Sequence, residues 1–359
     1  MPLTEYEENP MLFRQEDNKI HAKNCPCCYI CNHQGHNLYH GLTDRLFSAP
    51  GEWNLKKCSN PGCGLVWLDP KPLPEEVGKA YKNYYTHHDT GDHANTLPRR
   101  LYKAAKEGYL AQRYGYYGDS VDIYKRLLGL LLYFHPGRRE SMDFSVMYLP
   151  SQPNGLMLDI GCGSGHKLRF LQDLGWNTEG LDFDPVAVDK AKAKGLKVRL
   201  GNLASQNYPE NCFDVITMSH LIEHVYDPLE LLRECRRILK PGGRLVMITP
   251  NSESWGHKIL KNSWLALDPP RHLYIFSLAS LQLLAGKAGF EKYKISTTIR
   301  EANGLFAASK IIQRTGQYLW GSGIPFTLRL WSRCMQFVEW ALLKLKPGCG
   351  EEIAMVVEK

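Results

Sequence analysis

A glycine-rich segment is the first place in the chain where residue types and spacing indicate chemistry. Residues 159–165 read Asp-Ile-Gly-Cys-Gly-Ser-Gly, at the end of an apolar run that begins at Leu156. Such a turn between a strand and a helix lets the backbone approach a ligand and presents amide N–H groups at a helix start. A dinucleotide site requires G-x-G-x-x-G, and His166 occupies the place of its last glycine. The contacts expected from this loop are Asp159, Gly161, Cys162, Gly163 and Gly165.

Residues at the ends of the next two apolar runs complete the predicted ligand site. Asp182 lies about twenty residues past the loop, where a carboxylate accepts hydrogen bonds from both hydroxyls of a ribose. Phe183 is expected to pack on an adenine ring, and Asn202 and Leu203 are expected to contact the same ring. The G-x-G-x-G spacing with a preceding Asp is typical of sites for S-adenosylmethionine (SAM). The loop therefore predicts SAM as the cofactor.

The segment His220-Leu-Ile-Glu223-His224 follows another apolar run, 215–218. H-x-x-E-H also occurs in zinc peptidases, but there it lies on a helix, whereas here it follows a strand at the edge where parallel sheets bind ligands. Ser219 and His220 are expected to line the cofactor pocket through backbone contacts. Alternatively, His220 or His224 is a general base for the methyl acceptor, or the residues only brace a helix. The remaining hypothesis is a divalent metal held by His220, Glu223 and His224, with His272 as a fourth ligand.

Arg271 and His272 follow two prolines that hold the chain extended. We expect both residues to lie over the cofactor cleft and to face the substrate. The Arg271 guanidinium suits a carboxylate or phosphate group there. A salt bridge that closes a loop is the alternative for Arg271.

Six of the eleven cysteines lie within residues 21–75. Thiolates in two spaced pairs can close a tetrahedral zinc site, and in a reducing compartment such clusters indicate metal rather than disulfides. Cys25 offers an alternative pair with Cys28, so the choice of one pair stays open. The preferred zinc ligands are Cys28, Cys31, Cys58 and Cys63.

The elements that position these residues follow from the alternation of short apolar runs with amphipathic segments after residue 156, which predicts an α/β fold. We expect a Rossmann-like, mostly parallel sheet of seven strands with helices on both faces. A helix is expected over 229–239, ending before Pro241-Gly242-Gly243. The predicted strands cover 156–160, 178–181, 197–200, 215–218, 244–248, 293–298 and 353–357. The predicted organisation is a flexible N-terminus (1–20), a zinc-ribbon-like module (21–75), a helical connector or lid (76–150) and a catalytic domain (151–359) with a helical insertion at about 301–347.

Residues 157–290 resemble class I SAM-dependent methyltransferases in several motifs that occur in the same order. They read LDIGCGSG at 158–165, GLDFDP at 180–185, FDVITMSHLIEHV at 213–225 and RRILKPGGRLVMITPN at 236–251. The resemblance implies methyl transfer to a small molecule, because the HLIEHV and WLALDPPRHL stretches are similar to a subgroup with an N-terminal zinc-ribbon-like module. The metal hypothesis is similar to the arrangement in quinone O-methyltransferases and small-RNA 3′-end methyltransferases, which have Glu-x-x-Glu-His at this place. In this sequence His220 replaces the first Glu of that motif, which puts metal dependence in doubt.

Composition limits the remaining classes of function. The net charge of +7 is mild and no dense Lys/Arg run indicates nucleic-acid binding, although an RNA methyltransferase and a non-catalytic scaffold stay as alternatives. No apolar run reaches the length of a membrane span, and the acidic first residues do not resemble a secretory signal, so we expect a cytoplasmic protein. Apolar and basic residues mix in 301–347, which could lie on a membrane and admit a lipid-linked substrate or equally act as a lid or dimer face.

Overall fold

The computed structural model describes residues 19–82 and 96–359. The predicted flexible N-terminus (1–20) therefore lies almost entirely outside the described residues, as does part of the predicted connector.

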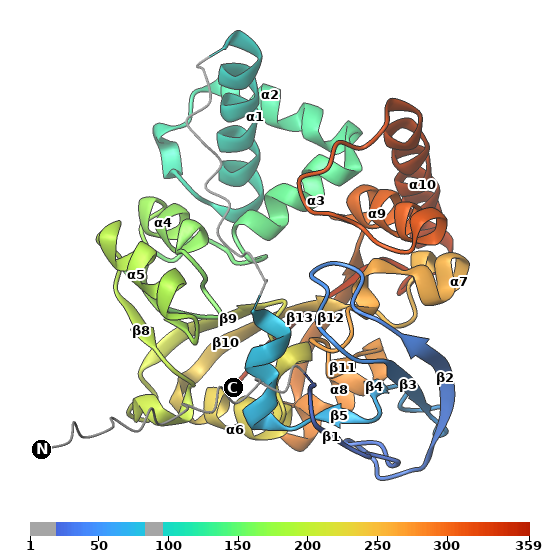
Figure 1. The fold of residues 1–359 in the computed structure, drawn as a ribbon. Helices are drawn as coiled ribbons and strands as arrows, with labels where there is room; N and C mark the ends of the chain where they lie inside the picture. The colour runs from blue at the N-terminus through green and yellow to red at the C-terminus, as the bar shows by residue number, and fades with distance from the viewer. Residues whose placement is uncertain (1–18, 83–95) are drawn as a thin grey trace, which may run out of the picture.

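A seven-stranded sheet forms the centre of the protein and confirms the predicted fold class (Figure 1). Its strand order is β12-β13-β10-β9-β6-β7-β8, and only β13 runs antiparallel to its neighbours. All seven predicted runs form strands. The strands are β6 (Leu156–Ile160), β7 (Asn177–Asp182), β8 (Val198–Leu200), β9 (Phe213–Ser219), β10 (Leu239–Pro250), β12 (Lys292–Thr298) and β13 (Glu352–Glu358).

Local sequence signals fix the helices that connect these strands. Asp184 caps α5 (Pro185–Ala193) and Asp227 caps α6 (Pro228–Ile238), each by accepting a backbone N–H of the first turn. Ser277 and Ser280 form a capping box at the start of α8 (Leu278–Lys287). The glycine loop leads into α4 (His166–Asp173). One boundary differs from expectation. The strand predicted to begin at residue 244 already begins at Leu239, before the Pro-Gly-Gly turn, and its pairing register with β9 shifts across that turn.

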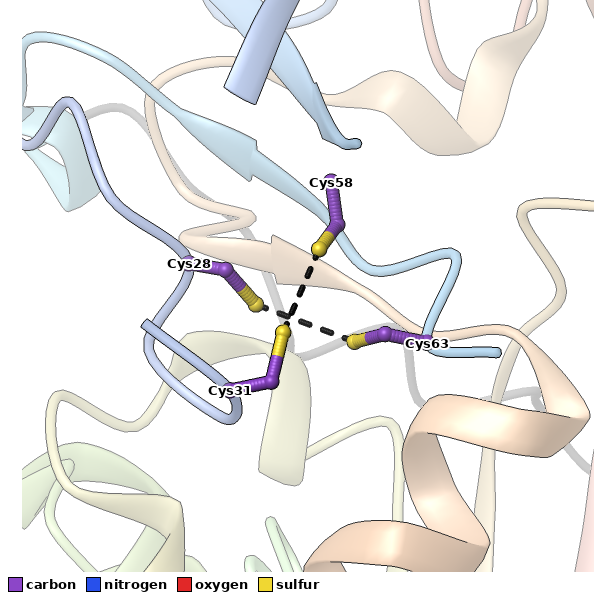
Figure 2. A group of neighbouring side chains, drawn as sticks. All are labelled: Cys28, Cys31, Cys58 and Cys63. Atoms are coloured by element: carbon purple, nitrogen blue, oxygen red, sulfur yellow. Dashed lines mark hydrogen bonds between the residues drawn. The ribbon is translucent and has the colours of Figure 1, made fainter. Parts of the chain in front are cut away.

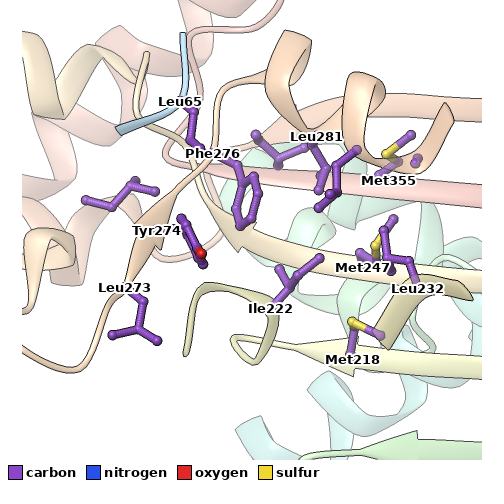
Figure 3. Packing of buried hydrophobic residues seen from close by; sticks show 14 of the residues in the cluster. Leu65, Met218, Ile222, Leu232, Met247, Leu273, Tyr274, Phe276, Leu281 and Met355 are labelled. Atoms are coloured by element: carbon purple, nitrogen blue, oxygen red, sulfur yellow. The ribbon is translucent and has the colours of Figure 1, made fainter. Parts of the chain in front are cut away.

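The cysteine-rich module packs against the large sheet instead of standing apart from it. Its strands β2 (Gly35–Leu42), β3 (Trp53–Cys58) and β4 (Val66–Leu68) form an antiparallel sheet, to which the later segment Tyr274–Ile275 adds β11. At the end of the module, Lys71–Pro72 forms the short strand β5 against β1 (Ala22–Lys23). Figure 3 shows the shared core, where Leu65 and Tyr274 continue into Phe276, Ile222 and the sheet residues.

Helices form two further groups. The first comprises α1 (Leu97–Tyr114), α2 (Ile123–Leu130), η3 (Leu131–Phe134) and α3 (Pro136–Ser145), whereas η1 (Pro74–Tyr81) lies apart from them. The second contains α9 (Ala302–Thr315) and α10 (Phe326–Leu345), the predicted insertion between β12 and β13, together with α7 (Trp255–Leu260). No helix within the described residues is long and apolar enough to cross a membrane.

Candidate active site

The glycine loop at the end of β6 has the backbone geometry of a ligand cradle. Gly161, Gly163 and Gly165 have φ angles of +75°, +54° and +80°, which side-chain-bearing residues rarely adopt. A Cβ on Gly165 would lie 2.3 Å from Leu196 Cδ1, so packing also requires glycine there. By contrast, no heavy atom outside the adjacent residues lies within 4 Å of a Cβ placed on Gly163. The space beside the middle of the loop is therefore open to a ligand.

Asp159 is buried beneath this loop, and within the described part of the chain only one of its two carboxylate oxygens has hydrogen-bond partners. Its Oδ1 accepts hydrogen bonds from Thr217 Oγ1 at 2.6 Å and from Lys167 Nζ at 3.3 Å. Its Oδ2 has no hydrogen-bond partner among the residues that the structure describes. A buried carboxylate oxygen normally has a donor, and the ammonium group of a bound amino-acid moiety would supply one. The residues present therefore fit SAM.

The other predicted cofactor contacts lie around the same sheet edge. Asp182 is buried at the end of β7, accepts the N–H groups of Gly163 at 2.7 Å and Asp184 at 2.9 Å, and has its pKa raised by burial. Phe183 is largely exposed and its ring meets the edge of Tyr81. Burial also raises the pKa of the Cys162 thiol, which packs against the backbone of β7.

Asn202 and Leu203 have local structural contacts. The Asn202 side chain accepts the N–H of Ser205 at 2.9 Å, and Leu203 is buried. Ser219 is half-buried at the end of β9, next to β6 in the sheet. Leu221 packs on the glycine loop, with its Cδ1 3.2 Å from a Cβ placed on Gly161. The segment that carries His220 is therefore adjacent to the predicted cofactor loop.

A cavity of about 570 Å³ lies on this side of the molecule. The cysteine-rich module contributes Leu46 and Phe47 to its wall, and α9 with the loop that follows it contributes Leu305, Tyr318 and Trp320. Its polar lining comprises His220, His224, Asp268, His272, Arg300, Glu301, Glu351 and Glu352. One part of the cavity wall is thus apolar and aromatic, and another part gathers ionisable groups.

His220 is held between two buried carboxylates. Its Nε2 lies 2.8 Å from Glu352 Oε1 and its Nδ1 lies 3.3 Å from Glu223 Oε1. Burial alone would lower the pKa of His220, but hydrogen bonds and charge from Glu223 and Glu352 outweigh it and raise the pKa to about 10. Arg300 pairs with the same Glu352 oxygen, and its Nη2 lies 3.4 Å from His220 Nε2. At neutral pH His220 is therefore a cation with no lone pair to accept a proton, which speaks against the general-base hypothesis for this residue.

Glu223, His224 and His272 form a separate cluster whose ligand atoms all lie within 4.8 Å of one another. His224 Nδ1 lies 3.1 Å from the carbonyl oxygen of Arg271, and His272 Nδ1 lies 2.8 Å from that of Ala266. A carbonyl oxygen only accepts, so each of these two contacts is a hydrogen bond when the Nδ1 carries a proton, and the Nε2 of that neutral tautomer has a lone pair. Histidine ligands of metals commonly have this arrangement.

Glu223 brings a carboxylate to the same cluster. Its side chain is fully buried, its Oε2 accepts a hydrogen bond from Thr249 Oγ1 at 2.9 Å, and its Oε1 lies 3.3 Å from His220 Nδ1. Of the four ligands hypothesised from sequence, the structure brings together Glu223, His224 and His272. The imidazole of His220 instead bridges Glu223 and Glu352. His220 has a left-handed backbone (φ +52°) and the motif continues into only a short 3₁₀ turn, so the helix of a peptidase site is not formed.

Arg271 does not face the cavity, contrary to expectation. Its guanidinium is buried, with Nη1 and Nη2 at 2.7 and 2.8 Å from the two carboxylate oxygens of Asp44 and with Nε at 3.0 Å from Asp268 Oδ2. Nη1 also donates to the carbonyl oxygen of Ala80. The loop-closing alternative fits this geometry, because Arg271 fastens the loop at Asp44 and Leu46 of the cysteine-rich module to the cavity wall.

The four preferred cysteines converge, as Figure 2 shows. The Sγ atoms of Cys28 and Cys63 are 3.7 Å apart, and those of Cys31 and Cys58 are 3.3 Å apart. A tetrahedron of four zinc–sulfur bonds has sulfur–sulfur edges of about 3.8 Å. Cys25 is outside this group and its Sγ instead lies near the carbonyl oxygen of Lys23. The residues fit a structural zinc ion held by the Cys28/Cys31 pair rather than the Cys25/Cys28 pair.

Several residues of the cavity were not found from sequence. Arg300 and Glu352 surround His220 but follow β12 and begin β13, far from the motif at 220–224 in the chain. No motif surrounds Arg300 and Glu352, so only the strand order could have identified them. Outside the cavity lining, Tyr81 at the end of η1 places its hydroxyl 2.9 Å from His224 Nδ1.

Comparison with known proteins relates part of this chain to one family. Residues 134–295 match the family model for a methyltransferase domain. The matched residues contain the glycine loop and the segment at 220–224, and the chain is similar there to S-adenosylmethionine-dependent methyltransferases. The chain is 32% identical over 139 residues to a probable S-adenosylmethionine-dependent methyltransferase of Mycolicibacterium smegmatis, covering 38% of this chain and 51% of that protein.

A second relative is also matched over only part of its length. The chain is 33% identical over 119 residues to the ubiquinone biosynthesis O-methyltransferase of Actinobacillus pleuropneumoniae, covering 29% of this chain and 51% of that protein. The chain therefore spans about half the length of these curated relatives. Among solved structures, a SAM-dependent methyltransferase from Archaeoglobus fulgidus has 19% identity and a TM-score of 0.41, covering 62% of this chain and 92% of that chain.

Proposed function

We propose that the protein is an enzyme that transfers the methyl group of SAM to a small organic acceptor bound in the cavity beside His220. The cavity carries this proposal, because its volume of about 570 Å³ is that of a typical small-molecule site. Methylation at oxygen or carbon is favoured, since the polar lining can orient a hydroxyl or an activated carbon. A methyltransferase acting on RNA, and a scaffold without activity, are the alternatives.

The residues of the chain divide the work between binding and orientation. SAM, when bound, supplies an electrophilic methyl group. In the proposal, Asp159 and the glycine loop bind its amino-acid part and Asp182 accepts hydrogen bonds from its ribose. The apolar side chains Phe47, Leu305 and Trp320 exclude water from the acceptor and fix its position, which is a large part of what a methyl transfer requires.

A labelling experiment with a cavity variant tests the small-molecule acceptor. With SAM carrying a tritiated methyl group, we expect label in the low-molecular-weight fraction of a cell extract and none in its RNA. Leu305→Trp fills the cavity from α9 and should reduce this transfer at least about tenfold without changing SAM affinity. Leu305→Met, of nearly equal volume, is the matched control. Label found only in RNA, or equal transfer by the tryptophan variant, would contradict the proposed acceptor site.

The proposal includes a divalent cation at Glu223, His224 and His272, in addition to structural zinc at the four cysteines. Two imidazoles and one carboxylate suit first-row divalent ions. The convergence of one ligand atom from each of the three residues, all within 4.8 Å of one another, supports this assignment. A cation there would lie at the cavity wall, where it would act on the acceptor as a Lewis acid.

Metal counting tests the second cation and its ligands. After dialysis against Mn²⁺ or Zn²⁺, the wild-type protein should hold one more exchangeable ion per chain than His272→Ala, whose affinity should fall by about 100-fold or more. His220→Ala, which removes a histidine outside the cluster, should keep the exchangeable ion. Inductively coupled plasma mass spectrometry with equilibrium dialysis gives both numbers. An absent second ion in the wild type, or one lost with His220 but not with His272, would refute the assignment.

A further inference from the structure

Helix α10 presents a row of large apolar side chains to the outside of the protein. Phe326, Leu330, Phe337 and Leu345 recur at helical spacing and are 73%, 55%, 61% and 84% exposed. The opposite side of the same helix is buried through Leu328, Ser332 and Glu339. Core packing therefore accounts for the inner side of α10 and leaves the outer row unexplained, and a row of this extent marks an interaction surface.

Charge on the outer side of α10 has one sign. Arg329, Arg333 and Lys344 are exposed between the apolar side chains, and Lys346 follows directly after the helix. Within Phe326–Leu345 the only acidic residue is Glu339, which is fully buried. The surface is thus apolar in the middle, basic at its sides and free of exposed carboxylates along this helix.

A second exposed apolar segment adjoins α10. On α2 and η3, Leu127, Leu131 and Phe134 are exposed at helical spacing. Gly137 follows closely after Phe134, and a Cβ placed on it would come within 3.0 Å of the Gln336 side chain of α10. In the view of Figure 1, α2 and α10 both lie at the top of the molecule, and α3 connects the two regions. The two apolar rows therefore lie on neighbouring elements, joined through α3.

We propose that α10 and the α2–η3 segment bind together to the surface of an anionic membrane. A helix with an apolar row between basic residues lies in the interface, where its apolar side chains enter the lipid and its cations meet negative headgroups. A second copy of the chain is a poorer occupant, because a symmetric contact through α10 would oppose the cations of one copy with the same cations of the other. Anionic lipid supplies the negative charge that the surface itself lacks.

The cavity opens beside this surface. The loop between α9 and α10 contributes Tyr318, Trp320 and Ile324 to the cavity wall, and Trp320 is half exposed. Binding through α10 therefore brings the cavity to the lipid interface, where an acceptor with a long apolar part would be available.

Vesicle sedimentation of the full chain without SAM tests this surface independently of methyl transfer. The vesicles contain phosphatidylcholine alone, or three parts phosphatidylcholine to one part phosphatidylglycerol. We expect binding to the anionic vesicles only, weakened by added salt. Reversing both Arg329 and Arg333 to Glu should lower the partition coefficient at least about thirtyfold. Phe337→Ser should lower it roughly tenfold through lost apolar burial.

The matched control carries the same change in net charge elsewhere. Lys192→Glu combined with Arg233→Glu alters exposed residues of α5 and α6, and this variant should bind vesicles within about twofold of the wild type. Thermal melting confirms that every variant is folded. Equal binding to neutral vesicles, no binding to either kind, or unchanged binding by the α10 charge variant would overturn the proposal. A dimer in sedimentation equilibrium that Phe337→Ser dissociates would overturn it in favour of a second copy.

Discussion

Replacing Gly163 with arginine is expected to abolish SAM binding while the protein stays folded. No heavy atom outside the adjacent residues lies within 4 Å of a Cβ at this position, so the new side chain meets no neighbour there. The φ angle of +54° costs a side-chain-bearing residue only about 1–2 kcal/mol. The arginine would, however, occupy the open space beside the loop, where the cofactor is proposed to lie. We expect the dissociation constant for SAM to rise at least about 1,000-fold.

The chain offers a matched control for this variant. Gly242 also has a positive φ, +75°, and nothing within 4 Å of its Cβ position, but it lies in the turn of β10 away from the cofactor loop. Gly242→Arg should therefore bind SAM as the wild type does. Equilibrium dialysis with labelled SAM compares the proteins, and thermal melting compares their stability. If Gly163→Arg bound SAM within about tenfold of the Gly242 variant, the loop would not be the cofactor site.

Cys63→Ser is expected to remove the structural zinc ion and to destabilise the whole protein. Cys63 is fully buried, and its thiolate would supply one of four ligands. Its carbonyl oxygen also accepts a hydrogen bond from Ser277 Oγ at the start of α8, so the zinc site is joined to the large sheet and its helices. We expect a loss of about 4 kcal/mol in the free energy of unfolding and a melting temperature lower by about 10 °C.

Cys25→Ser is the control, and it also decides between the two cysteine pairs. Cys25 lies outside the cluster, so this variant should keep one zinc ion that resists mild chelation and should melt close to the wild type. Zinc content by mass spectrometry and thermal melting follow both changes. A wild-type protein without zinc, or equal zinc loss from the two variants, would contradict a site made by Cys28, Cys31, Cys58 and Cys63.

Local patterns predicted the sheet and the cysteine cluster well. The central strands contain short apolar runs, which alternate with amphipathic helical segments, and that alternation identifies them. The two cysteine pairs lie close together in the chain and at the same end of the paired strands β2 and β3. Their convergence therefore follows from local pairing and could be predicted from the spacing. The glycine loop combines a spacing with a backbone conformation that only glycine readily adopts.

Contacts between distant segments could not be predicted in the same way. His220 lies beside Glu352 only because β13 inserts between β10 and β12, and no local pattern encodes that order. The same holds for Arg271, which pairs with Asp44 in the cysteine-rich module rather than facing the cavity. Within the motif at 220–224, the left-handed backbone of His220 separates it from His224, and it is His272 that completes the cluster.

Isothermal titration calorimetry of the full wild-type chain with SAM tests the central claim most directly. We predict saturable binding of one SAM molecule per chain, with S-adenosylhomocysteine competing for the same site because it retains the amino-acid and ribose groups that Asp159 and Asp182 are proposed to bind. Absence of binding by wild-type protein that melts cooperatively would contradict the account of the glycine loop and, with it, the proposed methyl transfer.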